Sequence, residues 1–132
     1  MLNSLDISAS ALTANRLRMD TVAQNLANMN TTRQADGEKT PYRRKFTLLQ
    51  PQRHDGGAGV SVRKVVADPT PFRRIYEPGH PDADGEGYVE MPNVDLAVET
   101  VNMMDASRAY EANVTMMETS KAMMNATLRL IG

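Results

Sequence analysis

The chain has 132 residues and no cysteine. It can therefore form no disulfide bond, thiolate metal site or cysteine nucleophile. No apolar run approaches the ~18 residues that a membrane-spanning helix needs, so we expect no direct insertion into a membrane. The first twenty residues have no basic residue before Arg16 and no continuous apolar block. Because this is not the pattern of a secretory signal peptide, we expect no cleaved signal.

An excess of charge of one sign is also lacking. The formal net charge is −1, so a nucleic-acid partner would gain no overall electrostatic attraction. Two basic clusters, Arg43–Lys45 and Arg73–Arg74, lie near aromatic residues, but residues 37–92 contain nine basic and eight acidic residues. We interpret these clusters as interface ion pairs or a solvated edge, and we predict no nucleic-acid partner.

Helix-breaking residues are almost absent from both ends of the chain. All seven prolines and seven of the eight glycines lie in residues 37–92, and the remaining glycine is Gly132. Proline and glycine are the strongest local interrupters of helices. The sequence therefore predicts an N-terminal helix (1–36), a Pro/Gly-rich middle that contains β-structure (37–92) and a C-terminal helix (93–132).

The C-terminal region repeats large apolar residues at every seventh position. This column consists of Leu96, Met103, Tyr110, Met117, Met124 and Ile131. Such a repeat is typical of a coiled-coil seam. The column three residues later consists of Glu99, Ala106, Asn113, Ser120 and Thr127. After Glu99 its members are small or short and polar, so a partner helix can approach closely on that side.

The N-terminal region has the same alternation. Its large column is Leu5, Leu12, Met19 and Leu26, and Ser8, Asn15, Val22 and Met29 follow at plus three. Helices over 4–30 and 94–131, started by Asn3 with Asp6 and by Asn93 with Asp95, would be roughly 40 Å and 57 Å long. The shorter helix cannot cover the longer one. We therefore expect neighbouring subunits to cover the rest, and adaptable methionines suit several different neighbours.

The middle region contains two candidate strands, 45–50 and 60–66, joined by a hairpin-type loop at 51–59. A third extended piece at 72–76 is followed by a Pro/Gly-rich loop at 77–87 and then by Tyr88 and Val89. Five of the six aromatic residues lie in this region. We therefore expect a small core of its own, in a segment too short to be a robust independent domain.

Candidate chemistry is sparse. Asp82, Asp84 and Glu86 alternate like the first ligands of a calcium loop, but the twelve-residue frame has no glutamate at its last position and no entering helix. We interpret this stretch as a solvated acidic loop and expect no metal and no cofactor. No nucleophile–base pair stands out, so we predict that the protein is not an enzyme. A small secreted metal-binding module and a DNA-associated coiled-coil protein remain as alternatives.

The stretch NLANMNT, residues 25–31, resembles the N-terminal signature of the bacterial flagellar axial proteins, which form the rod and hook. Their chains typically read Asn-apolar-small-Asn as the first helix ends. Further segments are similar to the proximal rod members of this family, in order over nearly the whole chain: TPYRRK (40–45), DPTPF (68–72), YEPGHPD (76–82), GYVEMPNV (87–94) and SRAYEANV (107–114). Another short rod protein of the family is the nearest alternative.

The resemblance implies a mainly α structural subunit of the rod, the drive shaft that crosses the periplasm. Its terminal helices would pair as an antiparallel coiled coil along the axial channel, with a small β-containing middle region. It would leave the cytoplasm through the flagellar type III export apparatus, transmit torque and catalyse nothing. Its partners would be further copies of itself, other rod and basal-body proteins, and the export apparatus.

The resemblance also suggests a role for the asparagines near the end of the first helix. We expect Asn25 and Asn28 to bridge subunits by amide hydrogen bonds, and Asn30 to end the helix. The residues that we predict to mediate subunit packing are Leu5, Leu12, Met19, Val22, Asn25, Leu26, Asn28, Leu96, Met103, Ala106, Tyr110, Asn113, Met117, Ser120, Met124, Leu128 and Ile131.

Overall fold

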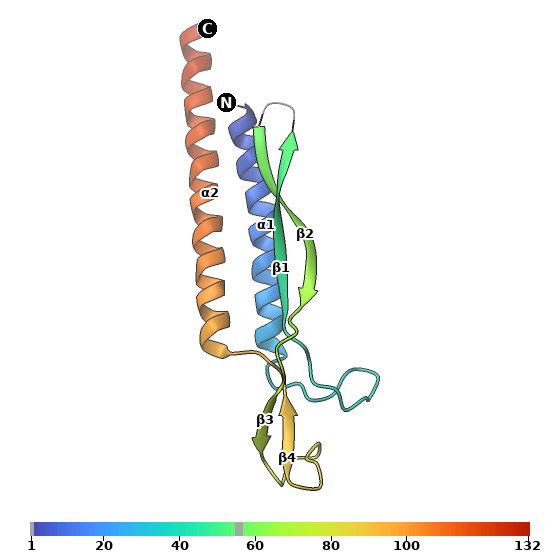
Figure 1. Cartoon of the computed structure of the whole chain (residues 1–132). Helices are drawn as coiled ribbons and strands as arrows, with labels where there is room; N and C mark the ends of the chain where they lie inside the picture. The colour runs from blue at the N-terminus through green and yellow to red at the C-terminus, as the bar shows by residue number, and fades with distance from the viewer. Residues whose placement is uncertain (1, 55–56) are drawn as a thin grey trace.

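The computed structural model describes residues 2–54 and 57–132. Its elements are, in chain order, α1 (Leu2–Ala27), β1 (Lys45–His54), β2 (Gly57–Ala67), β3 (Arg73–Tyr76), β4 (Tyr88–Met91) and α2 (Leu96–Ile131). The two helices lie antiparallel, and the hairpin β1–β2 runs along α1 (Figure 1). The pair β3–β4 extends beyond the end of the helix pair at which α1 finishes and α2 begins. The predicted fold class is confirmed: two long terminal helices with a small β-containing middle.

The helix termini follow from local capping. Asp95 is the N-cap of α2, and its carboxylate accepts hydrogen bonds from the backbone N–H groups of Ala97 and Val98, as expected for an acidic cap. At the end of α1, the Asn28 amide donates to the Gln24 carbonyl at 2.9 Å. The prediction that Asn30 ends the helix is wrong, because α1 ends at Ala27 and the side chain that caps its last turn is Asn28.

The helices meet through the columns of small and polar residues. The buried residues of α2 are Glu99, Ala106 and Ser120. The hydroxyl of Ser4 in α1 donates to the hydroxyl of Ser120 at 3.3 Å. The predicted close approach along this column is therefore confirmed. The column of large apolar residues lies at the flank of the contact instead, half-buried at Met103, Tyr110, Met117 and Met124.

The helices differ in length as the sequence predicts. Helix α2 has 36 residues and α1 has 26, which correspond to about 54 Å and 39 Å. Since Ser4 already lies opposite Ser120, residues 121–131 project beyond the start of α1 (Figure 1). Within the described chain, no helix covers this end of α2.

The hairpin is longer than predicted. Instead of a loop over 51–59, β1 and β2 continue pairing to His54 and Gly57, and Pro51 lies opposite Val60. Proline has no backbone N–H, so it fits a strand position that donates no hydrogen bond to the partner strand. The N–H of Val60 donates to the Ser10 hydroxyl of α1 instead, at 3.1 Å. The hairpin thereby packs closely on the helix.

The second sheet is the two-stranded pair β3–β4. Gly87, at φ +86, turns the chain into β4, and its backbone lies close to the ring of Tyr76. The buried side chains here are Val89, Met91 and Pro92. The middle region therefore has a small buried cluster, as expected, but the aromatic residues do not form it: all five of their side chains are half-buried or exposed.

Candidate assembly surface and polar junction

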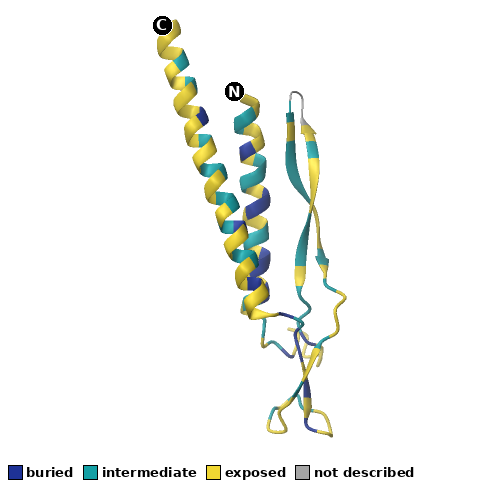
Figure 2. Cartoon of the chain, turned by 60° about the vertical axis from the view of Figure 1, so that its left-hand side comes forward, coloured by how far each residue is buried: buried dark blue, intermediate teal, exposed yellow. Residues whose placement is uncertain are grey.

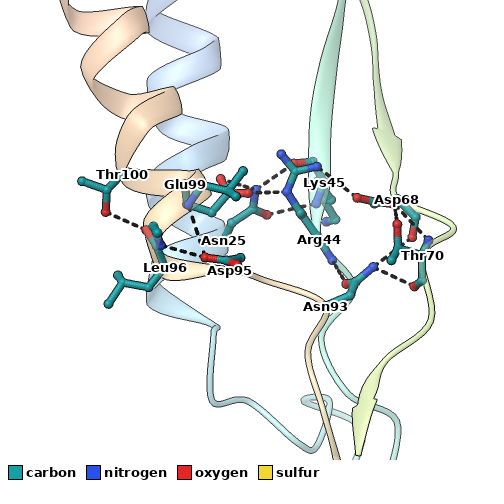
Figure 3. A network of polar contacts seen from close by, with 12 residues as sticks. Asn25, Arg44, Lys45, Asp68, Thr70, Asn93, Asp95, Leu96, Glu99 and Thr100 are labelled. Carbon is teal, nitrogen blue, oxygen red and sulfur yellow. Dashed lines mark hydrogen bonds and ion pairs between the residues drawn. The ribbon is translucent and has the colours of Figure 1, made fainter.

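Asn25 lies at the centre of a polar junction where α1, β1 and α2 meet (Figure 3). Its side chain is 0% exposed. The amide nitrogen donates to the Lys45 carbonyl at 2.7 Å and to Glu99 Oε2 at 3.3 Å, and the amide oxygen accepts from Tyr42 and from the Lys45 N–H. The prediction that Asn25 bridges subunits is wrong, because both donors and both acceptor positions are already used within the chain.

Glu99 is the acidic partner in this junction. Its side chain is 0% exposed and forms an ion pair with Arg44 Nε. Arg44 Nη1 also contacts Asp68 Oδ2 at 3.0 Å. Burial opposes the charge of Arg44, but hydrogen bonds and attraction from Glu99 and Asp68 outweigh it and raise the pKa of Arg44. Such a buried pair costs desolvation, and losing one partner leaves an uncompensated charge.

Asp68 and Asn93 extend the junction to the end of the hairpin (Figure 3). The side chain and N–H of Thr70, together with Arg44, lower the pKa of Asp68. Asn93 accepts from the Arg44 N–H and donates to the carbonyls of Asp68 and Thr70. Asn93 thereby ties the connection into α2 to the residues just before β1 and just after β2, at the open end of the hairpin.

The basic clusters have internal roles. Arg44 belongs to the junction, Arg43 lies over the Phe72 ring at 4.2 Å, and Arg74 Nη2 binds Asp84 at 3.2 Å. The expectation of interface ion pairs or a solvated edge is therefore wrong for Arg44, whereas Arg74, with 54% of its side chain exposed, fits a solvated edge. Burial and the charge of Glu99 raise the pKa of Tyr42, whose hydroxyl donates to Asn25.

The acidic loop at 80–87 is ordered by its own contacts. Asp82, with 8% of its side chain exposed, pairs with Arg33 and accepts from the Thr32 hydroxyl. Asp84 accepts from the N–H groups of Glu86 and Tyr88. The interpretation as a solvated loop holds for Glu86, 80% exposed, but is wrong for Asp82. Across residues 2–54 and 57–132, no group of three or more His, Asp or Glu side chains is placed to hold a metal ion.

The predicted packing residues fall into three groups. Val22, Asn25, Ala106 and Ser120 are buried within the chain. Half-buried positions are Leu5, Leu12, Met19, Leu26, Asn28, Met103, Tyr110, Asn113, Met117 and Met124. Leu96, Leu128 and Ile131 are 56%, 61% and 80% exposed. The second and third groups form incompletely covered columns along α1 and α2.

The exposed apolar surface of α2 is wider than the predicted columns. Val98, Val101, Met104, Met116, Met123 and Leu130 are each at least 49% exposed. Figure 2 shows that buried residues follow α1 but are rare along α2. Large exposed apolar surfaces mark interaction sites in soluble proteins. The adjacent pairs Met103–Met104, Met116–Met117 and Met123–Met124 widen this surface beyond one column. Val98, Val101 and Leu130 were not among the predicted packing residues.

Sequence reasoning also missed the junction. The one available signal was Glu99, a carboxylate at the head of a column of small residues. Its partners Asn25 and Arg44 lie 74 and 55 residues away, so no local pattern connects them.

Comparison with known proteins gives matches at both ends and over the whole length. Residues 5–33 match the family model "Flagella basal body rod protein", and residues 86–130 match "Flagellar basal body rod FlgEFG protein C-terminal". The chain is 45% identical to the flagellar basal-body rod protein FlgC of Bacillus subtilis, over 97% of this chain and 96% of that protein. It is 47% identical to FlgC of Escherichia coli O157:H7, over 98% and 97%.

The chain belongs to the FlgC family of flagellar basal-body rod proteins. A more distant FlgC, from Borreliella burgdorferi, is 37% identical over 99% of this chain and 97% of that protein. The similarity to FlgC proteins spans both helices and the middle region, so the whole fold is shared. Neither helix of the described chain is long and apolar enough to span a membrane.

Proposed function

We propose that this chain is a structural subunit of the flagellar rod, which packs against further copies and against other rod and basal-body proteins. The observation that carries the proposal is the exposed apolar surface of α2, in a chain whose relatives over their full length are basal-body rod proteins. Fully burying a Met, Leu or Val side chain yields roughly 1.5–3 kcal/mol. The uncovered columns of α2 therefore supply a driving force for assembly.

In this proposal the columns of large residues are subunit contacts, while the small column holds the helix pair together. Leu5, Leu12, Met19 and Leu26 continue the surface of α2 onto α1. Asn28, at the end of α1, and Asn113, half-buried on α2, remain candidates for contacts between subunits. The subunit transmits torque through these contacts, and the junction around Glu99 keeps the hairpin fixed to the helices.

We further propose that the protein is exported by the flagellar type III apparatus without a cleaved signal and that the rod crosses the periplasm. Membership of the FlgC family supports this part. The proposed role requires no catalysis, cofactor, metal, nucleic acid or direct membrane insertion.

The test is the substitution Met117→Asp. Met117 is half-buried in the single chain, so the proposed assembly buries it further. A carboxylate there loses the apolar gain and adds a desolvation cost. In a strain lacking the wild-type copy, motility should be lost while the exported fraction stays normal, because export acts on a largely unfolded chain.

Thr115→Asp is the matched control, because it introduces the same charge at an exposed position of α2 two residues away. It should retain much more motility than Met117→Asp. Full motility of Met117→Asp would refute burial of this column, and loss of export with motility would refute the proposed separation of export from assembly.

A further inference from the structure

A basic cleft lies between α1, β1 and α2. It has a volume of about 330 Å³ and is lined by Arg18 and Val22 of α1, Lys45 and Phe46 of β1, and Asn102 of α2. No acidic side chain lines it. The cleft combines cationic groups at its rim with apolar side chains in its walls, which suits a carboxylate carried on an apolar stem.

Three cationic residues line this cleft. Arg44 is paired with Glu99 and Asp68, whereas Arg18 and Lys45 lack acidic partners. Arg18 donates to the Asn15 amide oxygen, and Lys45 lies 5.9 Å from the centre of the Tyr42 ring. Neither forms an ion pair within residues 2–54 and 57–132. Glu99, the acid of the adjoining junction, is fully buried and already neutralised by Arg44. The cleft therefore presents uncompensated positive charge to an approaching molecule.

Negative charge is concentrated in the lobe formed by β3, β4 and the loop that joins them (residues 73–91). Residues 77–90 contain five acidic residues and neither lysine nor arginine. Asp82 and Asp84 are used to order the loop, as described above. The carboxylates that remain available are Glu77, Glu86 and Glu90, all exposed. Glu86 Oε2 lies 3.9 Å from Arg74, a residue already bound to Asp84.

The positions of cleft and lobe suit a head-to-tail contact. The lobe extends beyond the end of the helix pair (Figure 1), whereas the residues that line the cleft belong to α1, β1, the residue just before β1, and α2. The two surfaces are distinct and cannot meet within one chain. A contact between different patches of identical subunits is heterologous, and its repetition builds a ring or an open helical assembly rather than a two-fold dimer.

We propose that the cleft at Arg18 and Lys45 receives the acidic lobe of a second copy of this chain, with Glu86 and Glu77 as the entering carboxylates. The inference rests on the proposed function, since it names a specific contact between copies in the rod. It adds an electrostatic contact at the hairpin to the apolar contacts of α2. A contact at the cleft rim also depends on salt, because the screening length is ~8 Å at 0.15 M ionic strength.

The absence of cysteine allows a direct test by cross-linking. Two differently tagged versions, Thr47→Cys at the cleft wall and Gly85→Cys at the lobe, where an added Cβ meets no atom within 4 Å, are expressed together and treated with a short bis-maleimide in purified basal bodies. We expect a product of twice the 14.6 kDa chain mass that carries both tags. Either version expressed alone should give at least tenfold less. A product with a different basal-body protein, or no product in a motile strain, would overturn the proposal.

Charge reversal provides the second test. Arg18→Glu should reduce motility at least tenfold, and combining it with Glu77→Lys and Glu86→Lys should restore most of it. Arg16→Glu is the matched control on the same helix, outside the cleft. A loss that the lysine variants cannot restore, with unchanged helicity of Arg18→Glu, would contradict a second copy as the partner. Motility of Met117→Asp tests the proposed function separately, because that residue lies far along α2 from the cleft.

Discussion

Helices α1 and α2 resemble each other in pattern and differ in what surrounds them. Helix α1 lies between α2 and the hairpin, and six of its residues are buried; α2 is ten residues longer, yet only three of its residues are buried. The buried residues of α1 include Asn15, Thr21 and Asn25, whereas α2 leaves valines and methionines exposed. Hydrophobicity alone therefore does not decide burial in this chain. The number of neighbouring elements does.

The largest expected effect comes from breaking the junction that fixes both helices to the hairpin. Glu99→Ala removes one of the two acidic partners of Arg44 and one partner of Asn25. Removing one member of a buried ion pair typically costs ~3–5 kcal/mol, so the free energy of unfolding should fall by about that amount. Urea unfolding of the purified protein measures it. Glu118→Ala, at an exposed position of α2, should change it by less than about 0.5 kcal/mol.

The contact between α1 and the hairpin should be sensitive to a single methyl group. A Cβ at Gly59 would lie 2.6 Å from the Ser10 hydroxyl oxygen, so Gly59→Ala must displace the hairpin or break the hydrogen bond that the Val60 N–H donates to Ser10. Overpacking of this kind costs ~1–3 kcal/mol. Thermal unfolding should show the loss for Gly59→Ala but not for Gly79→Ala, where no atom lies within 4 Å of the added carbon. Equal melting temperatures would mean that the hairpin packs loosely.

Acid should weaken the junction and the lobe before it affects the helix contact. Hydrogen bonds from Thr70 and the charge of Arg44 lower the pKa of Asp68 in the folded state. Its contribution to stability is therefore fully present above the unfolded pKa of about 3.9 and is lost as the pH falls through the lower folded value. Between pH 6 and pH 2, the free energy of unfolding should fall less steeply for Asp68→Asn than for the unsubstituted protein. An unchanged slope would exclude Asp68 as a contributor.

The smallest effect should appear at the projecting end of α2. Residues 121–131 have no helix partner within the described chain, and an isolated helix end is marginal in water. In a dilute monomer, amide hydrogens there should exchange faster than those of residues 97–106 beside the junction. Addition of assembled basal bodies should slow this exchange if neighbours cover the end. Uniform protection along α2 in the monomer would show that its projecting end is as stable as the part beside the junction.

The sequence by itself determined the helix–middle–helix order, the start of α2 near Asp95, the first hairpin and the unequal lengths of the helices. These features depend on local properties: helix breakers, sevenfold spacing and capping residues act within a few positions. The sequence did not predict that β3 pairs with β4. The resemblance to rod proteins could also be inferred from the sequence, because it rests on short motifs that occur in the same order along the chain. The end of α1 was missed because Asn28, rather than Asn30, donates to the Gln24 carbonyl, and local spacing did not distinguish these asparagines. The extent of the hairpin was missed because packing on α1, including the hydrogen bond from Val60 to Ser10, supports the strands past Pro51.

Only the tertiary structure decided the roles of Asn25, Arg44 and Glu99. Asparagine at a helix end and an arginine beside lysine are usually exposed, and the sequence favoured contacts with other subunits. Folding instead brings these residues together from three elements, where each satisfies the buried polar groups of the others. A buried polar group is tolerated only with such partners, and partners separated by 55 and 74 residues are set by the packing of the whole chain.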